Sequence, residues 1–402
     1  KGNWGINAYQ DLVSDIVPSM EALTKQMVCV SNSYKNDANG SGLSLFRWLL
    51  RLTAFVNSDE LGNNKQLINI CMELLNDVTL PDQLVDDVLN CWASSMYACN
   101  KNRTDEVSDE DEVYMIQNES ELIEKVIIQC NTLQNQDPTS SKAIEEVDAE
   151  TLEETERWME SYNAAISIRI LQSVSWALRR GAGGRIVEGN EHFISMTPWI
   201  IDAITHPSVD LRCLGVRCLG LLTISEEKYY IDYHDLISNV LGNSSESTEV
   251  RVLALKSLFD SMLVHNTTSI STAKGTEEEQ EQALASATAA KTRVNGMVTT
   301  LTRIFAINDE VLVPIACEGV AKLLFSGIAT DSSRLCCCLL KQFFIEDMSP
   351  KSTITTPMEG DDMTDDELYA IETNQSNRDR LQQVLSLFFH SFYMVDASNA
   401  KI

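Results

Sequence analysis

Three arginines flank a glycine-rich turn near the middle of the chain: Arg179 and Arg180 precede residues 181–184, and Arg185 follows them. Guanidinium groups gathered in this way can bind the phosphates of a nucleic-acid backbone or the carboxylates of an acidic peptide. The plainer alternative is structural, because basic residues in the last turn of a helix compensate the negative end of its dipole. DNA binding at this turn is therefore a hypothesis that rests on charge alone.

A second basic pair, Arg47 and Arg51, lies in a strongly apolar segment at 43–56. Residues four apart lie on the same side of a helix, so these two guanidiniums point in a similar direction. The same DNA-binding hypothesis applies to this pair.

Two Ser/Thr-Pro pairs, at Ser349 and Thr356, lie in an acidic, polar stretch at 347–377. Proline-directed kinases need an extended and accessible serine or threonine, which such a stretch is expected to provide. Phosphate added here would increase an already negative charge. The alternative is that both pairs occur by chance, and the sequence does not decide between these interpretations.

Catalytic patterns are missing from the sequence. The glycine-rich turn follows a predicted helix rather than a strand, and no Gly-Lys-Ser/Thr completes a phosphate loop. The five histidines have no ligand spacing, the eleven cysteines contain no Cys-x-x-Cys pair, and no serine-hydrolase, zinc-protease or kinase motif occurs. We therefore expect no enzyme, with no catalytic residue, metal site, cofactor or small-molecule substrate. The cysteines are expected to be small core residues in a reducing compartment.

The composition is that of a globular, acidic protein, with 44% hydrophobic residues and a formal net charge of −28. Such a surface repels nucleic acid at long range, although salt screening leaves room for a local basic groove. No secretory signal is expected, and no apolar run approaches the ~20 residues that span a bilayer, so we expect no membrane partner.

A sequence repeat provides the clearest prediction of the fold. The segment that begins at Leu211 returns 39 residues later at Val250, with a basic residue next and a small residue three positions further on. A weaker copy begins at Leu312. A period of about 40 residues is typical of HEAT and armadillo helix pairs, which bury their apolar faces only by stacking on neighbours. The predicted fold is all-α: a HEAT-repeat α-solenoid, that is, a curved superhelical stack of antiparallel helix pairs.

Breaks in the helical pattern divide the chain into five predicted segments. They are an irregular helical, HEAT-like segment at 1–138; a long helix with the glycine-rich turn at 139–191; HEAT repeats at 192–346 with a polar insert at 266–292; an acidic flexible linker at 347–377; and a terminal helix, itself truncated, at 378–402.

Several blocks together resemble the G-type HEAT subunit of condensin. The blocks are residues 210–222, 250–265, 318–333 and 380–389, with looser similarity at 45–91. They follow the family's order along most of the chain, and any one of them alone would be a generic HEAT signal.

The resemblance implies a non-catalytic scaffold from the C-terminal half of a longer subunit. Condensin compacts mitotic chromosomes, and its ATPase activity belongs to other subunits. The implied partners are the kleisin subunit, double-stranded DNA held together with kleisin, and the SMC ATPase subunits indirectly. The implied location is the nucleus and chromosomes, with a cytoplasmic phase in part of the cell cycle. The alternative is another HEAT adaptor, such as a nuclear transport receptor, but the long inserts and the irregular first 190 residues favour condensin.

Overall fold

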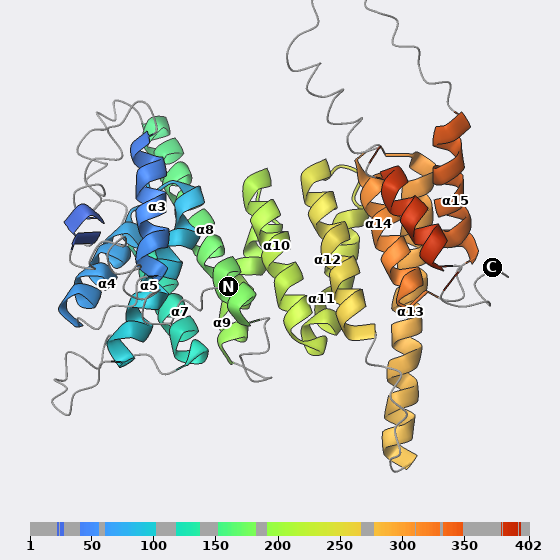
Figure 1. The fold of residues 1–402 in the computed structure, drawn as a ribbon, viewed down its shortest axis with the longest axis horizontal. Coiled ribbons are helices and arrows are strands. Elements are labelled where there is room, and N and C mark those ends of the chain that lie inside the picture. Colours follow the sequence, from blue (N-terminus) through green and yellow to red (C-terminus); the bar gives the residue numbers. More distant parts are fainter. Residues whose placement is uncertain are drawn as a thin grey trace, which may run out of the picture. The chain divides into compact units, whose positions relative to one another are not determined.

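The computed structural model describes most of the predicted helices. It covers residues 22–23, 25–27, 41–55, 61–101, 118–136, 152–181, 191–266, 277–309, 311–329, 333–348, 379, 381–392 and 394. Within these ranges every regular element is a helix, which confirms the all-α prediction (Figure 1). The chain divides into two compact units, residues 1–218 (unit 1) and 219–402 (unit 2), and the boundary along the sequence falls within one helix.

Unit 1 is built from helices that pack in pairs. They are α3 (Ser41–Phe55), α4 (Leu61–Asn76), α5 (Asp82–Lys101), α7 (Glu119–Gln134), α8 (Leu152–Gly181), α9 (Glu191–Ile204) and the first part of α10 (Val209–Ser225). Helix α5 packs against α4, α3 and α8, and α8 packs against α7 and α9. Helices α5 and α8 therefore connect the rest of the unit.

Unit 2 repeats the paired arrangement. It contains the rest of α10, followed by α11 (Glu227–Gly242), α12 (Thr248–Asn266), α13 (Glu277–Ile307), α14 (Leu312–Phe325), α15 (Ser333–Met348) and a last helical stretch at 381–392. Helix α12 packs on both α11 and α14, and α13 packs on both α14 and α15.

Local sequence signals explain where several helices begin. Asn118 accepts a hydrogen bond from the backbone N–H of Glu121 at 3.0 Å and so caps α7. Asp309 accepts hydrogen bonds from the backbone N–H groups of Val311 and Leu312, both at 3.1 Å, before α14. Gly327 follows the end of α14 with a φ of 75°, a conformation that glycine adopts at low cost.

The three repeat copies lie on α10, α12 and α14, each the second helix of its pair. Their small residues are buried: Gly215 lies against Ala203 of α9, while Ala254 and Ala316 are 0% exposed. The basic residue of the first copy, Arg212, donates to the carbonyl oxygens of His206 and Pro207 in the preceding turn, at 2.8 and 2.6 Å. The repeat motif therefore places a small residue where helices pack closely, and in the first copy it adds an arginine that binds the turn inside the pair.

The polar insert predicted at 266–292 is partly helical. Residues 277–292 form the first half of α13 and continue without a break into the repeat helix. In Figure 1 this half of α13 runs past the ends of α14 and α15. Glutamates at its start favour the positive end of the helix dipole, and alanines after them have high helix propensity, so the segment is helical without an apolar face.

Candidate nucleic-acid interface

The arginines predicted from the sequence are held by acidic residues of neighbouring helices. Arg47 and Arg51, on α3, donate through their Nε atoms to the two carboxylate oxygens of Asp87 on α5, at 2.9 and 2.8 Å. Asp87 is 8% exposed, whereas the arginine side chains are 42% and 41% exposed. A buried carboxylate therefore fixes two guanidiniums whose other edges face outward.

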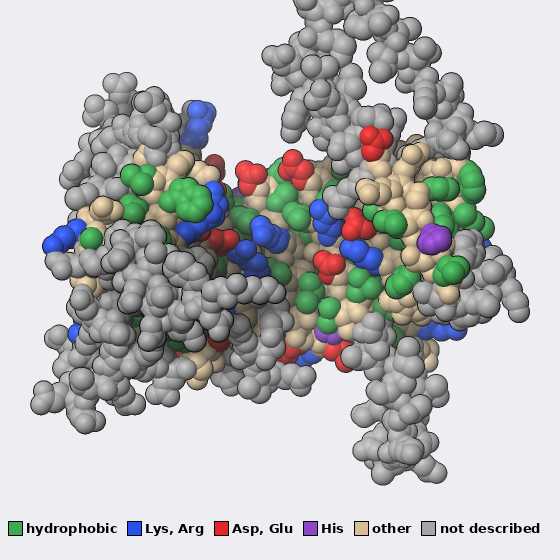
Figure 2. Space-filling view, in the orientation of Figure 1, with side chains coloured by type: hydrophobic (Ala, Val, Ile, Leu, Met, Phe, Trp, Pro, Cys, Tyr) green, Lys and Arg blue, Asp and Glu red, His purple; other side chains and the backbone are tan. Residues whose placement is uncertain are grey.

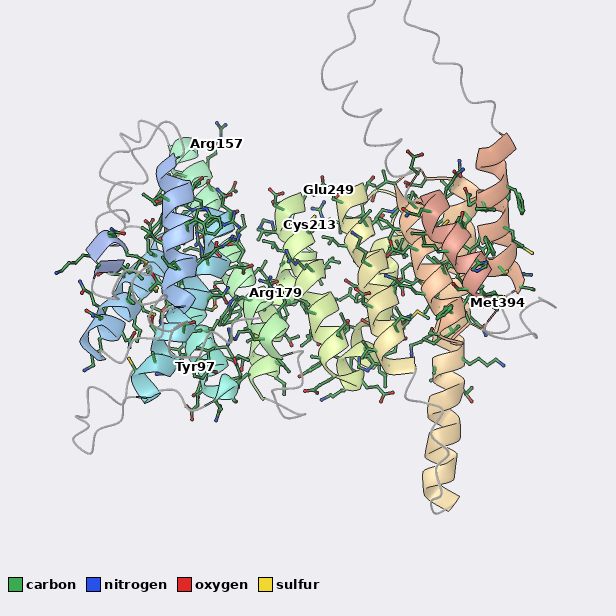
Figure 3. The ribbon with its side chains drawn as sticks, viewed as in Figure 1. Tyr97, Arg157, Arg179, Cys213, Glu249 and Met394 are labelled. Atoms are coloured by element: carbon green, nitrogen blue, oxygen red, sulfur yellow. The ribbon has the colours of Figure 1, made fainter. Side chains whose placement is uncertain are left out.

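Arg179, at the end of α8, binds the residue of α5 that precedes Asp87. Its Nη2 atom lies 2.6 Å from a carboxylate oxygen of Asp86, and its Nε atom donates to the backbone oxygen of Ser175. Figure 3 labels Arg179 on α8. Adjacent carboxylates of α5 thus bring together two groups of arginines that are more than 120 residues apart in the sequence.

Arg180 points to a different neighbour and is more buried. It forms a two-pronged ion pair with Glu119 of α7, at 2.9 and 2.8 Å, and its guanidinium lies 4.9 Å from the ring centre of Trp176. The hydrogen bond to Glu119 raises the pKa of Arg180. Burial and the charge of Glu119 raise the pKa of nearby Tyr97 to about 12. Arg180 therefore connects α7 and α8, a structural role that leaves it less available to a ligand.

Two further residues of this surface were missed by sequence reasoning. Trp48, between the two α3 arginines in sequence, is 68% exposed, and the Arg51 guanidinium lies 5.9 Å from its ring centre. Arg217 on α10 is exposed. Burial raises the pKa of the neighbouring Cys218 thiol to about 12, while the charges of Arg217 and Arg179 lower it, which places both arginines near this sulfur.

A signal for both residues was present in the sequence. Trp48 directly follows Arg47, and Arg217 has a basic counterpart in the next repeat, Lys256. We call the group formed by Arg47, Trp48, Arg51, Arg179 and Arg217 the arginine cluster.

The arginine cluster is locally positive in a strongly acidic chain. Three of its guanidiniums, those of Arg47, Arg51 and Arg179, contact the two carboxylates of Asp86 and Asp87, and Arg217 adds a fourth positive charge. Figure 2 shows basic side chains gathered on the face that α3 and α8 present, with acidic side chains among them. A net positive surface of this kind can contact an anionic polymer even though the chain as a whole repels it.

The remaining predicted site residues lie outside the described part of the chain. These are Arg185, Ser349 and Thr356. Their roles in DNA binding and phosphorylation stay predictions.

Other chemistries find no support in the described residues. They contain no group of three or more His, Cys, Asp or Glu side chains that could hold a metal ion. None of their helices is both long and apolar enough to cross a bilayer.

Comparison with known proteins identifies the class and then the family. The chain is similar to a chain of the "Crystal structure of the S. pombe condensin Cnd3-Cnd2 subcomplex", with 17% sequence identity and a TM-score of 0.55, over 95% of this chain and 40% of that one. The fold is therefore that of a condensin HEAT-repeat subunit, as predicted, and the chain spans less than half the length of that relative. No curated protein matches it. Residues 189–402 match the family described as "Nuclear condensing complex subunits, C-term domain", and the chain belongs to this family.

Proposed function

We propose that this chain is part of a non-catalytic condensin scaffold that binds kleisin and, together with kleisin, helps to hold double-stranded DNA. The observation that supports it most is the family match over residues 189–402, joined with a HEAT fold similar to one solved as a Cnd3-Cnd2 subcomplex. A protein of this fold thus forms a complex with a second condensin subunit. Stacked helix pairs offer long surfaces for such a partner.

The proposal extends to the place of the chain in the cell. Kleisin connects it to the SMC ATPase subunits, so the chain acts on chromosomes without hydrolysing ATP itself. Its location is nuclear and chromosomal, with a cytoplasmic phase in part of the cell cycle.

Kleisin binding is tested by size-exclusion chromatography of the purified chain with kleisin segments. We expect one kleisin segment to co-elute with the chain in a stable complex. The small GTPase of nuclear transport is the control partner, because a transport receptor is the main alternative among HEAT proteins. Co-elution with the GTPase and with no kleisin segment would favour that alternative.

DNA binding is proposed for the arginine cluster rather than for the glycine-rich turn as a whole. Arg180 is a poor contact residue because it is bonded to Glu119 inside the fold. Arg47, Arg51 and Arg179 keep outward edges that can reach phosphate oxygens. Kleisin is needed because the chain alone has a charge of −28, which opposes association with DNA.

The DNA prediction concerns the variant Arg47→Glu/Arg51→Glu/Arg179→Glu. In complex with kleisin this variant should bind a labelled duplex more weakly than the parent. The negative slope of log affinity against log salt should become shallower by about 2–3, since each of the three lost phosphate contacts contributes roughly 0.9 to its magnitude. Fluorescence anisotropy from 50 to 200 mM salt measures both quantities.

The matched control reverses the same amount of charge at Lys291, Arg334 and Lys341, which are exposed in unit 2. Equal loss of affinity in both triple variants would assign the effect to net charge and remove the arginine cluster from the DNA contact. Without kleisin we expect binding to be weak or undetectable for every variant.

A further inference from the structure

Trp48 is the feature of the arginine cluster that phosphate binding leaves unexplained. Phosphate contacts need only cations and hydrogen-bond donors, yet a large aromatic side chain lies 68% exposed on the same helix as two ordered arginines. Single exposed apolar residues are common on proteins. The unusual feature here is that two arginines of the same helix are already oriented by Asp87, and that one of them, Arg51, lies beside the ring.

The side chains of Arg47 and Arg51 are preorganised by their hydrogen bonds to Asp87. Each uses its Nε atom for Asp87, and among the described residues their Nη atoms form no other hydrogen bond. Asp87 is buried, so the two guanidinium groups are held on their protein-facing side. Orienting side chains in advance reduces the entropy lost on binding. Arg47 and Arg51 therefore present fixed outward donors on one side of α3, and Arg51 lies beside the Trp48 ring.

An indole ring beside oriented cations matches one polyanion better than others. Proteins that bind single-stranded nucleic acid combine a basic surface along the backbone with aromatic rings on which bases stack. In an intact duplex the base faces are covered by neighbouring base pairs, so a protruding ring has no face to stack on. An acidic peptide would satisfy the arginines, but its carboxylates do not stack on an indole.

We propose that Trp48 stacks on an unpaired base while Arg47 and Arg51 bind the adjacent phosphates, so that unit 1 favours DNA with unpaired bases over intact duplex. This inference rests on the proposed DNA function of the arginine cluster and adds to it the kind of DNA that is bound. Arg51, close to one face of the ring, also favours a stacked arrangement through its cation–π contact.

The test compares Trp48→Ala and Trp48→Phe in the chain–kleisin complex, with a single-stranded 30-mer and the corresponding duplex as probes. Trp48→Ala should weaken single-strand binding about 5- to 100-fold, the range expected for loss of one stacked base, and change duplex binding less than about twofold. Trp48→Phe should recover most of the loss because phenylalanine still stacks.

Two controls use residues outside the proposed contact. Leu45→Ala removes another exposed apolar side chain from α3, and Phe344→Ala removes an exposed aromatic one from α15. Both should bind the two probes like the parent protein. In addition, intrinsic fluorescence should be quenched by the single strand in the parent and much less in Trp48→Phe.

The possible outcomes separate this inference from the proposed function. Equal effects of Trp48→Ala on both probes, or no effect on either, would overturn the stacking role, while loss of duplex binding in the triple arginine variant would still support the DNA function. Failure of the parent complex to bind any DNA would overturn both. Binding of a poly-glutamate peptide to the parent complex, lost in the triple arginine variant and without single-strand binding, would instead assign the surface to an acidic protein segment.

Discussion

The role of an arginine side chain in this protein depends on its hydrogen-bond partner more than on its charge. Arg180 and Arg179 are adjacent in sequence, yet Arg180 is bonded to Glu119 inside the fold and Arg179 reaches Asp86 at the surface. No local pattern distinguishes the two arginines, because their carboxylate partners lie 61 and 93 residues away along the chain. Their position in the last turn of α8 is equally consistent with dipole compensation.

A buried histidine of unit 2 gives a prediction for pH. His234 is 5% exposed, and burial lowers its pKa from the ordinary value of 6.5, with Arg293 adding to the decrease and the bond to Asp235 opposing it. The unfolded chain then binds a proton more readily than the folded chain. The free energy of unfolding should therefore decrease as the pH falls through about 6.5 toward the lower folded pKa.

The measurement is urea unfolding of the parent and His234→Gln at pH 8 and pH 5.5. Since other groups also titrate, the expected result is the difference between the proteins: the parent should lose more stability on acidification than the variant. Equal losses would show that His234 is not held neutral by its surroundings.

At the scale of elements, helix positions could be predicted closely from apolar spacing and from breaks. The apolar pattern at 43–56 corresponds to α3 at Ser41–Phe55, and the repeat motifs lie on α10, α12 and α14. The continuity of α13 was harder to predict, because its first half has no apolar face and depends on alanine propensity and acidic residues at its start. Contacts between helices that are distant in sequence, such as α5 with α8, leave no periodic signal.

Close packing of the repeat helices gives a second prediction. A Cβ at Gly319 of α14 would overlap the ring of Phe259, which is 4% exposed on α12, whereas a Cβ at Gly296 of α13 would meet nothing within 4 Å. Gly319→Ala should lower the free energy of unfolding by about 1–3 kcal/mol through overpacking. Gly296→Ala should raise it by about 0.5–1 kcal/mol, because alanine favours the helix.

Thermal and urea unfolding of the two alanine variants provide the comparison, since the chemical change is the same in both. Similar stability of Gly319→Ala and the parent would mean that α12 and α14 are packed less closely than described. Loss of stability in Gly296→Ala would place that glycine in a packed environment.

The whole molecule combines an acidic composition with stacked helix pairs and, in its described part, a locally basic cluster. The fold class was predictable because the 39-residue repeat reflects a structural unit that must stack. The site was predictable only in part: charge patterns gave Arg47, Arg51 and Arg179, but their convergence on α5 depends on tertiary packing. Trp48 lies next to Arg47 in the sequence, but its exposure could not be predicted from this position, because the helix around it is apolar.

The central claim, that the protein acts as a scaffold inside condensin, is tested most directly by affinity purification of the full-length protein from mitotic cells, followed by quantitative mass spectrometry. The expected result is recovery of kleisin and both SMC ATPase subunits in near-equal amounts, with loss of the SMC subunits when kleisin is depleted. Recovery of a transport GTPase and its cargo, without kleisin, would contradict the claim.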